Sequence, residues 1–452
     1  MSAVTQVSAT TSDSALSART RWTIVALLSA SITINLIDRQ TLSQLAAILR
    51  DQWHWSNAQY GYIATIFNLG MMLGQIPAGA FLDRVGTKIG LATIFVGWSL
   101  VCALHAFAGP GTAIESVASG IWSVLPGVPA IGAGLAGFFL LRFVMGLLEC
   151  GNYTGGIKAI AGLFPKETRS RAGGVFNAGA QLGSVLAGPL ILSLLIETLG
   201  FGWQLGFVIP AVLGLLWLIP WLAVFPDKKT MTAVALKPAQ TAAVQTAHVP
   251  LRRLFANHHV LGLLLIRVFS GPITTFYWTW LPLYLRNGRG MTLFATGLMS
   301  SVPQLFGMAG NVFGGVFTDR FVQTMGSDRG RKLGFVCAFS LGALSMTMPF
   351  VGNNYVAVLL MGLALFGNQW YAATYIGTVG DIVPQHLAGR VNGIAGFGDN
   401  GAVTFAILYT GIIVDRYGWS QVFVAAGILP LLAMLTVFFV LRKIEPARFA
   451  AA

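Results

Sequence analysis

Long apolar stretches recur about a dozen times along the 452-residue chain, and this recurrence constrains its fold more than any other feature. A helix rises ~1.5 Å per residue and satisfies its own backbone groups, so ~20 apolar residues span the hydrocarbon core of a bilayer. Apolar residues make up 55% of the chain and charged residues only 10%, against the ~25% charge of a soluble domain. The sequence therefore predicts an all-α membrane protein.

We expect twelve transmembrane helices, arranged as two six-helix pseudo-repeats. They lie near 22–48, 60–83, 88–108, 131–162, 170–197, 204–225, 258–286, 293–320, 332–351, 354–380, 388–416 and 420–442. No signal peptide is evident in the polar first residues. The expected organisation is a cytoplasmic tail at 1–21, a bundle at 22–225, a cytoplasmic linker at 226–257, a second bundle at 258–442 and a cytoplasmic tail at 443–452.

The basic residues are distributed unevenly between the loops. Under this helix assignment 20 of the 28 Lys and Arg lie on one side of the membrane, and four, Arg50, Arg286, Arg289 and Arg416, lie on the other. Cytoplasmic loops carry the excess of Lys and Arg, so both termini should be cytoplasmic. The net charge of +13 thus reflects topology, and we expect a multi-pass protein of a bacterial-type cytoplasmic (inner) membrane with no nucleic-acid partner.

A short motif occurs once in each set of six helices. Segments 79–84 and 315–320 both have the spacing Gly-x-x-x-Asp-Arg and both end an expected helix. The candidate gating residues are Gly79, Asp83, Arg84, Lys88, Asp319 and Arg320. A carboxylate at a helix end near cationic groups can latch one conformation. An ordinary solvated loop would not need the same spacing in both halves.

A second match relates segments 164–171 and 383–390, each of which introduces a Gly-rich helix. On this register Gln181 corresponds to Asn400, and Glu149 corresponds to Asn368. Small residues let membrane helices approach closely. We expect this packing role for Gly70, Gly74 and Gly79 in the first half and for Gly310, Gly314 and Gly315 in the second.

Ionisable side chains inside the expected helices are the first functional candidates, because a charge within the bilayer is costly. Asp38 and Arg39 lie midway along the helix at 22–48, and Arg142 and Glu149 lie in the helix at 131–162. Arg142 and Glu149 are seven residues apart, so both should face one cavity at levels ~10 Å apart. Arg39 would offer a fork of donors to a substrate carboxylate. Asp38, Glu149 and Arg142 would carry the proton coupling.

Two of these assignments have a plain alternative. The charges could form a static network that only holds two helices together, although buried ion pairs often contribute little net stability. Lys158 is a candidate anion contact, but it lies near a helix end, where a lysine also reaches lipid headgroups.

The second half offers mainly neutral polar groups. Arg267 lies in the helix at 258–286, which continues through Pro272 into the aromatic run 276–280. A Pro-broken helix can line a cavity. The residues assigned to substrate binding besides Arg39 and Lys158 are Gln181, Asn368, Trp370 and Asn400.

The motif at 79–88 resembles the cytoplasmic signature of the major facilitator superfamily. Within it, the chain resembles the anion:cation symporter family, and its bacterial hexuronate and aldonate (galactonate-type) transporters in particular. The residues that carry this resemblance are Asn35, Asp38, Arg39, Arg142, Glu149, the segment 156–169, Gln181 and Asn400. The resemblance implies that Arg39 binds the substrate carboxylate, that Asp38 and Glu149 couple protons, and that Gln181 and Asn400 contact the substrate.

The sequence departs from that family at four positions. Two tyrosines of the family are replaced by Leu36 and Met71, an acidic residue before Pro272 is replaced by Gly271, and Asp399 is unexpected. These changes make the cavity more apolar near the first two helices but keep the carboxylate clamp.

The combined expectation is a secondary transporter that imports a small organic anion, such as a hexuronate, an aldonate or a related carboxylate, by proton symport with alternating access. Its partners would be that anion, protons and the lipid bilayer, and it would work as a monomer. A proton-driven drug or metabolite exporter and an organic-anion exchanger of the same superfamily are the alternatives. An exporter of hydrophobic cations should not need Arg39 beside Asp38.

Enzyme and scaffold functions fit the sequence less well. The six histidines are scattered, and Cys102, Cys150 and Cys337 occur singly in apolar segments. A membrane enzyme would need a nucleophile, a metal cluster or a phosphate loop, so we expect no catalytic residues, no metal and no cofactor. A scaffold would not explain charges buried in both halves.

Overall fold

The computed structural model describes residues 16–123, 134–164, 166–227 and 251–447, and within these ranges it is helical and contains no strand. The first half consists of α1 (Ala18–Trp53), α2 (Asn57–Val85), α3 (Thr87–Leu104) with the 3₁₀ turn η1 (His105–Phe107), α4 (Ala113–Ser123), α5 (Leu135–Leu163), α6 (Lys166–Gly188) continued by the π-helix η2 (Pro189–Thr198), and α7 (Trp203–Val224).

The second half repeats the order of the six long helices and has the short α9 before them. It consists of α9 (Leu251–Ala256), α10 (His258–Thr279), α11 (Leu281–Leu283) with η3 (Tyr284–Gly288), α12 (Leu293–Met325), α13 (Ser327–Gly342) with η4 (Ala343–Phe350), α14 (Asn354–Ile382), α15 (Gln385–Tyr417), and α16 (Trp419–Thr436) with η5 (Val437–Leu441). Each of the twelve helices expected from the sequence has a counterpart here.

Ten of these helical segments are long and apolar enough to cross a membrane. An eleventh, α2, is bent by 47° between Asn57–Gln75 and Pro77–Val85. Proline lacks the N–H that the helix needs at this point, so a bend is expected. α12 has 33 residues but is not among the ten, and its buried polar residues Thr296, Ser300, Ser301 and Gln304 lower its hydropathy. The prediction of an all-α membrane fold is confirmed.

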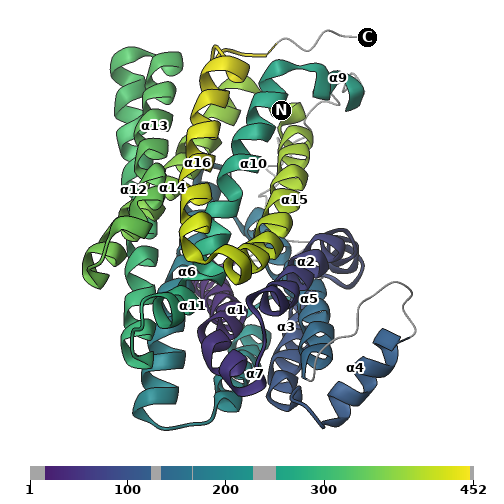
Figure 1. Cartoon of the computed structure of the whole chain (residues 1–452). Coiled ribbons are helices and arrows are strands. Elements are labelled where there is room, and N and C mark those ends of the chain that lie inside the picture. The colour runs from purple at the N-terminus through teal and green to yellow at the C-terminus, as the bar shows by residue number, and fades with distance from the viewer. Residues whose placement is uncertain (1–15, 124–133, 165, 228–250, 448–452) are drawn as a thin grey trace, which may run out of the picture.

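Two loops expected from the sequence contain helices. α4 lies within the segment 109–130, and its Glu115 carboxylate accepts hydrogen bonds from the Gly134 and Gly137 N–H groups at 2.9 and 2.7 Å. This contact ties α4 to the start of α5, beside which it lies in Figure 1. α9 lies at the end of the expected linker, of which residues 228–250 are outside the described residues.

Glycines set how closely α2 and α5 approach. A Cβ at Gly74 would lie 2.6 Å from the Leu147 carbonyl oxygen, so the two backbones are in direct contact. Gly70, Gly310 and Gly314 also meet a neighbouring helix too closely for a side chain, which confirms the packing role expected of them. The same expectation is wrong for Gly79, because no described atom lies within 4 Å of a Cβ there.

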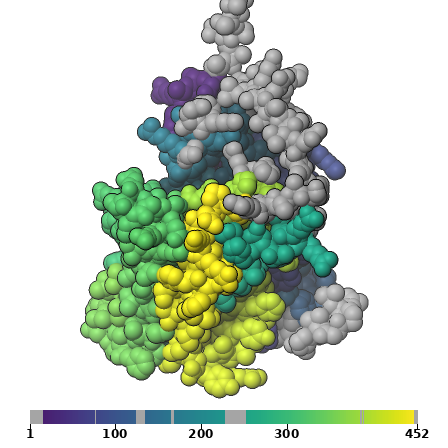
Figure 2. Space-filling view, turned by 90° about the horizontal axis from the view of Figure 1, so that it is seen from above, coloured from purple at the N-terminus to yellow at the C-terminus, as the bar shows by residue number. Residues whose placement is uncertain are grey.

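The two halves form separate bundles that meet at one end, as Figure 1 shows. In Figure 2 the teal-to-yellow second half covers most of the near face, and the purple-to-blue first half lies mainly beyond it. One hydrophobic core draws residues from both halves, among them Leu42, Tyr60, Phe276 and Trp280. The other two cores each belong to one half.

The shared core lies where α1 ends and α2 begins, and we call this the closed end. Inter-half hydrogen bonds gather there: the Ser43 hydroxyl donates to the Trp278 and Thr279 carbonyls at 2.8 Å, and the Tyr60 hydroxyl donates to the Thr279 carbonyl at 2.7 Å. At the opposite end, the open end, α2 and α12 finish and α6 and α15 begin. Glycines with no described atom within 4 Å of a Cβ line these helix ends: Gly79, Gly173, Gly174, Gly389 and Gly393.

Asp415 makes a further inter-half contact at the closed end. Its carboxylate, near the end of α15, accepts hydrogen bonds from the Asn57 N–H at 3.0 Å, the Asn57 side-chain amide at 2.7 Å and the Ala58 N–H at 2.8 Å. The first N–H groups of a helix have no partner within it, and the helix dipole favours a negative charge there. One half therefore caps a helix of the other.

Candidate functional site

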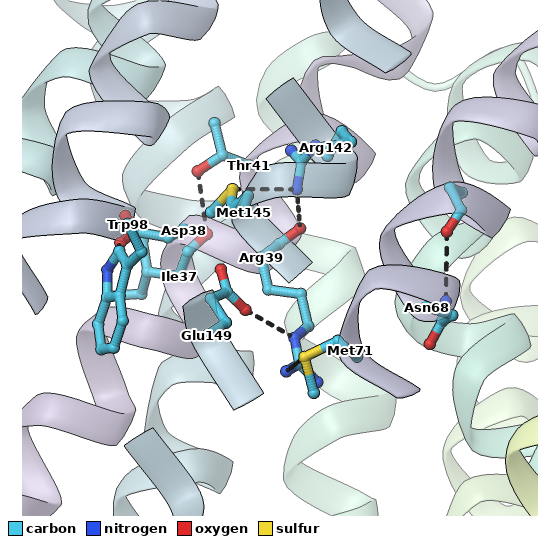
Figure 3. Close-up of polar contacts among 11 residues, drawn as sticks. Ile37, Asp38, Arg39, Thr41, Asn68, Met71, Trp98, Arg142, Met145 and Glu149 are labelled. Atoms are coloured by element: carbon cyan, nitrogen blue, oxygen red, sulfur yellow. Dashed lines mark hydrogen bonds and ion pairs between the residues drawn. The ribbon is translucent and has the colours of Figure 1, made fainter. Parts of the chain in front are cut away.

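Asp38 and Arg39 lie near the middle of α1 and point in different directions, because successive residues of an α-helix are ~100° apart. Asp38 is fully buried and accepts a hydrogen bond from the Trp98 indole N–H of α3 at 3.0 Å. Figure 3 shows Trp98 beside Asp38 and the Arg39 side chain extending away from them. Asp38 therefore belongs to the interior of the first half, and Arg39 to its cavity side.

Arg39 is held by α5 and α2. Its Nε lies 3.3 Å from the Glu149 Oε2, and its Nη2 lies 3.3 Å from the Met71 sulfur. The guanidinium also lies 5.2 Å from the centre of the Phe67 ring. The Arg39 side chain is 24% exposed, whereas the Glu149 carboxylate is fully buried. The positive partner of this ion pair is thus the one that an incoming anion can reach.

Arg142 is buried beside this pair. Its Nη1 donates to the Arg39 carbonyl at 3.4 Å, and its guanidinium lies 5.8 Å from the centre of the Phe67 ring. Arg142 and Glu149 were expected to face one cavity; Arg142 lines the cavity described below, whereas Glu149 is not among its lining residues and contacts Arg39. Both residues are at most 2% exposed, so both side chains lie in the interior of the first half.

The charged network has unused hydrogen-bonding capacity. The atoms Asp38 Oδ1, Glu149 Oε1, Arg142 Nε and Arg142 Nη2 are buried and have no hydrogen-bond partner among the described residues. Leaving a buried charged group unsatisfied costs free energy. A buried polar atom without a protein partner can bind water or a ligand group.

A small cavity of about 80 Å³ lies between the halves next to this network. Arg39 and Arg142 line it from the first half, together with Tyr60, Phe67 and Asn68, and Thr275, Trp278 and Thr279 line it from the second. The hydrogen bonds of Ser43 and Tyr60 to the Trp278–Thr279 backbone close it toward the closed end. A ligand here would touch both halves and two arginines, Arg39 and Arg142.

The structure brings only part of the expected substrate site together. Asn368 donates to the Ser270 carbonyl at 3.1 Å and accepts from Thr274, and the Asn400 amide donates to the Gly396 carbonyl of its own helix at 2.9 Å. Trp370 is buried in the core of the second half and donates to the Thr318 hydroxyl at 2.8 Å. Gln181 is half-buried on α6.

Lys158 lies away from Arg39, at the open end. Its Nζ contacts the Asp83 carboxylate at 2.5 Å and the Leu82 carbonyl at 3.0 Å. The lysine assigned to the anion therefore neutralises the first-half motif in this conformation. Lys88, also at the open end, pairs with Asp227 at 3.0 Å.

The second-half motif has a matching arrangement. The Asp319 carboxylate lies 3.5 Å from Arg331, and Arg331 also contacts Asp381 at 3.0 Å. Arg320 is exposed. Both motif carboxylates thus pair with a cation of their own half, which is compatible with the predicted latch; the latch itself stays a prediction.

Arg267 of α10 and Asp399 of α15 form an ion pair in the second half, in which Nε and Nη2 both donate to Oδ2. The sequence placed Arg267 in a helix that can line a cavity and showed Asp399 as an unexpected residue, but it did not pair them. Trp98, Tyr60 and Phe67 were missed, because single aromatic residues in uniformly apolar helices give no sequence signal. Among the described residues no group of His, Cys, Asp and Glu could hold a metal.

Comparison with known proteins identifies the fold's family. The sequence matches the profile of the Major Facilitator Superfamily over residues 28–327 and 324–452. The chain belongs to this superfamily. Solved major facilitator structures resemble it over almost its whole length. One is a bacterial homologue of the human lysosomal transporter Spinster in an inward-facing, unoccupied conformation, with a TM-score of 0.73 and 15% identity over 94% of this chain and 98% of that one. A D-xylose–proton symporter gives a TM-score of 0.72 and 16% identity over the same shares.

Curated relatives within the superfamily confirm the resemblance to sugar-acid transporters. A probable galactarate/D-glucarate transporter of Escherichia coli is 27% identical over 446 residues, which are 94% of this chain and 96% of the relative. The hexuronate transporter of Escherichia coli is 27% identical over 94% and 95% of the two chains. A probable L-galactonate transporter of Escherichia coli is 28% identical over 94% and 90%. These relatives are transporters, not enzymes.

Proposed function

We propose that this major facilitator imports a small sugar acid, such as a hexuronate, an aldonate or a related carboxylate, together with protons. The observation that carries the proposal is the Arg39–Glu149 pair, in which a partly exposed guanidinium beside the inter-half cavity is neutralised by a fully buried carboxylate. The names of the relatives support a sugar-acid substrate.

In the proposed cycle the substrate carboxylate and Glu149 compete for Arg39. An arginine can bind a carboxylate through two parallel hydrogen bonds. Arg39 donates to Glu149 through Nε alone, and its Nη2 contacts the Met71 sulfur. Protonation of Glu149 weakens its hold on Arg39, and the substrate then replaces it. A proton and an anion are therefore bound together. Asp38, buried on the other face of α1, is the second acid of the coupling network.

The difference between the two ends of the molecule supports a proposal of alternating access. The halves are joined at the closed end and apart at the open end, so rocking one bundle against the other would exchange the two states around the site. If the termini are cytoplasmic, as the distribution of Lys and Arg predicts, the present conformation faces inward. In this proposal the working unit is a monomer, with the cavity between the two halves of one chain.

The test is uptake by purified protein in proteoliposomes, screened with hexuronates, aldonates and aldarates. We expect accumulation driven by an inward proton gradient. Counterflow without proton-driven accumulation would instead indicate an exchanger, and loss of preloaded anion driven by the proton gradient would indicate an exporter. No movement of any of these acids would contradict the proposal.

The membrane topology has its own test. In a variant without the three native cysteines, single reporter cysteines near either terminus and in the linker 226–257 should react with an impermeant maleimide only in broken cells of a bacterial host. Reporters at Arg289 and Asn353 should react in intact cells. Labelling of the linker in intact cells would contradict cytoplasmic termini in an inner membrane.

A further inference from the structure

The ion pair between Arg267 and Asp399 is not used by the proposed cycle. Arg267 places Nε 3.1 Å from the Asp399 Oδ2 and donates to the same oxygen through Nη2, so the pair does not engage Nη1. The Arg267 side chain is 32% exposed and the Asp399 side chain 15%. As with Arg39 and Glu149, the arginine is the more accessible partner.

The site for this carboxylate exists because residue 271 is glycine. A Cβ at Gly271 would overlap the Asp399 carboxylate, whose Oδ1 would be its nearest neighbour. Gly271 lies four residues after Arg267, one turn further along α10. The carboxylate of α15 therefore occupies space on α10 that any other residue at position 271 would fill.

An aromatic side chain of α14, Tyr375, lies beside the pair. The Arg267 guanidinium lies 5.7 Å from the centre of the Tyr375 ring. Tyr375 is 5% exposed, and its hydroxyl, like the Asp399 Oδ1, is buried without a hydrogen-bond partner among the described residues. An oxygen-rich ligand at Arg267 would thus meet a guanidinium and an unsatisfied hydroxyl in a setting where charge interactions are strong.

Helix periodicity directs Arg267 toward the path between the halves. Arg267 lies eleven residues before Trp278, which is close to three full turns, so both are on one face of α10. Trp278 lines the inter-half cavity. Asn400, assigned to substrate binding, follows Asp399 on α15.

The depth of Arg267 follows from the Ser43–Trp278 contact. Ser43 of α1 contacts the Trp278 carbonyl of α10, and Arg39 precedes Ser43 by four residues. At ~1.5 Å per residue, Arg267 lies roughly 10 Å nearer the open end than Arg39. The path therefore has an accessible arginine in each half, at two successive depths.

We propose that Arg267 is a second anion site, which binds the distal carboxylate of a dicarboxylic sugar acid whose first carboxylate is bound by Arg39. Asp399 is the resident counter-ion that the distal carboxylate displaces. A monocarboxylate leaves the Arg267–Asp399 pair intact. This inference rests on the proposed function and narrows its substrate class to aldarates, the sugar acids with a carboxylate at each end.

The experiment compares galactarate with galactonate, which share a carbon skeleton but carry two carboxylates and one. In proteoliposomes the parent should have a lower KM for galactarate. Arg267→Gln should raise the KM for galactarate about tenfold, in the range of a lost charge-assisted hydrogen bond, and should change the KM for galactonate much less. Asp399→Asn should lower the KM for galactarate.

Two further variants serve as controls for this comparison. Arg267→Gln combined with Asp399→Asn leaves no unpaired charge and should show the same selective loss, which covers the case in which the single variant does not fold. Arg329→Gln neutralises an exposed arginine of α13 and should change neither KM.

Equal rises of both KM values in the Arg267 variants would overturn the inference, as would a parent that transports galactonate but not galactarate. In the second case the proposed function survives. A parent that transports neither acid, nor any other sugar acid, would remove the proposed function itself.

Discussion

Asp38 and Arg39 are adjacent in the sequence but belong to different environments: Asp38 accepts a hydrogen bond from Trp98 at 3.0 Å inside the first half, and Arg39 contacts Glu149 at 3.3 Å beside the cavity. A single turn of α1 therefore connects a buried acid to the substrate path. If ligand binding at Arg39 shifts α1, Asp38 moves with it, because both residues belong to the same helix. This relationship gives each charged residue a separately testable role.

Arg39→Lys should weaken substrate binding by about tenfold or more, because lysine keeps the charge but loses the planar fork. Calorimetric titration of the purified protein with its best substrate measures this effect. Arg286→Lys, at the closed end outside the cavity, is the matched control and should bind as the parent does. Equal affinity of Arg39→Lys and the parent would contradict the carboxylate clamp.

Glu149→Gln should abolish uphill accumulation driven by protons while counterflow between preloaded vesicles remains measurable. Glutamine keeps the shape of the side chain but cannot exchange a proton, and counterflow does not require deprotonation in each cycle. The exposed Glu197 provides the control variant Glu197→Gln. If Glu149→Gln still accumulates substrate to the parent's level, the coupling acid is another residue, with Asp38 the next to test.

Trp98→Phe should impair proton-driven uptake more than counterflow, because it removes the hydrogen bond to the Asp38 carboxylate and changes the proton affinity of a buried acid. The loss of one such bond should also lower the free energy of unfolding by about 1–3 kcal/mol. Trp221→Phe removes an indole hydrogen bond to the Lys88 carbonyl instead. A similar loss of coupling in both variants would show that Asp38 is not the reason.

Asp415→Ala should favour the state that is open at the present closed end, because it removes three hydrogen bonds that α15 accepts from α2. These bonds are exposed, so a shift of about fivefold in the population is expected. The rate at which a cysteine at Ser43 reacts with an impermeant maleimide measures it. Asp51→Ala, an exposed acid at the same end, should leave that rate unchanged, and an unchanged rate in Asp415→Ala would show that the Asp415 hydrogen bonds do not hold the closed end together.

The helices were predictable because apolar stretches of the right length have few alternative structures, and Arg39 and Glu149 were predictable because a charge in a membrane helix is rare. The direction of each side chain was not. Asp38 was expected to act together with Glu149, but its hydrogen-bond partner Trp98 was not foreseen, because the position of Trp98 depends on the packing of α3 against α5 and α7.

Residues that contact the ends of helices were the hardest to assign from the sequence. Lys158 was assigned to the anion, yet it contacts Asp83, since the bend of α2 and the packing of α5 decide which groups meet at the open end. The sequence did not predict a role for Asp415, because acidic residues are common at helix ends. Its role depends on the helix of the other half that it caps.

The unpacked glycines of the open end have a practical consequence. A methyl group at Gly79, Gly173 or Gly389 meets no described atom in the present conformation, so alanine there carries no steric penalty in this state. When the bundles rock, the same helix ends come together, and the added groups would then obstruct their contact. Such substitutions are therefore candidates for arresting the protein in a single state. They offer a route to conformation-selective antibodies and to trapping a bound substrate for structure determination.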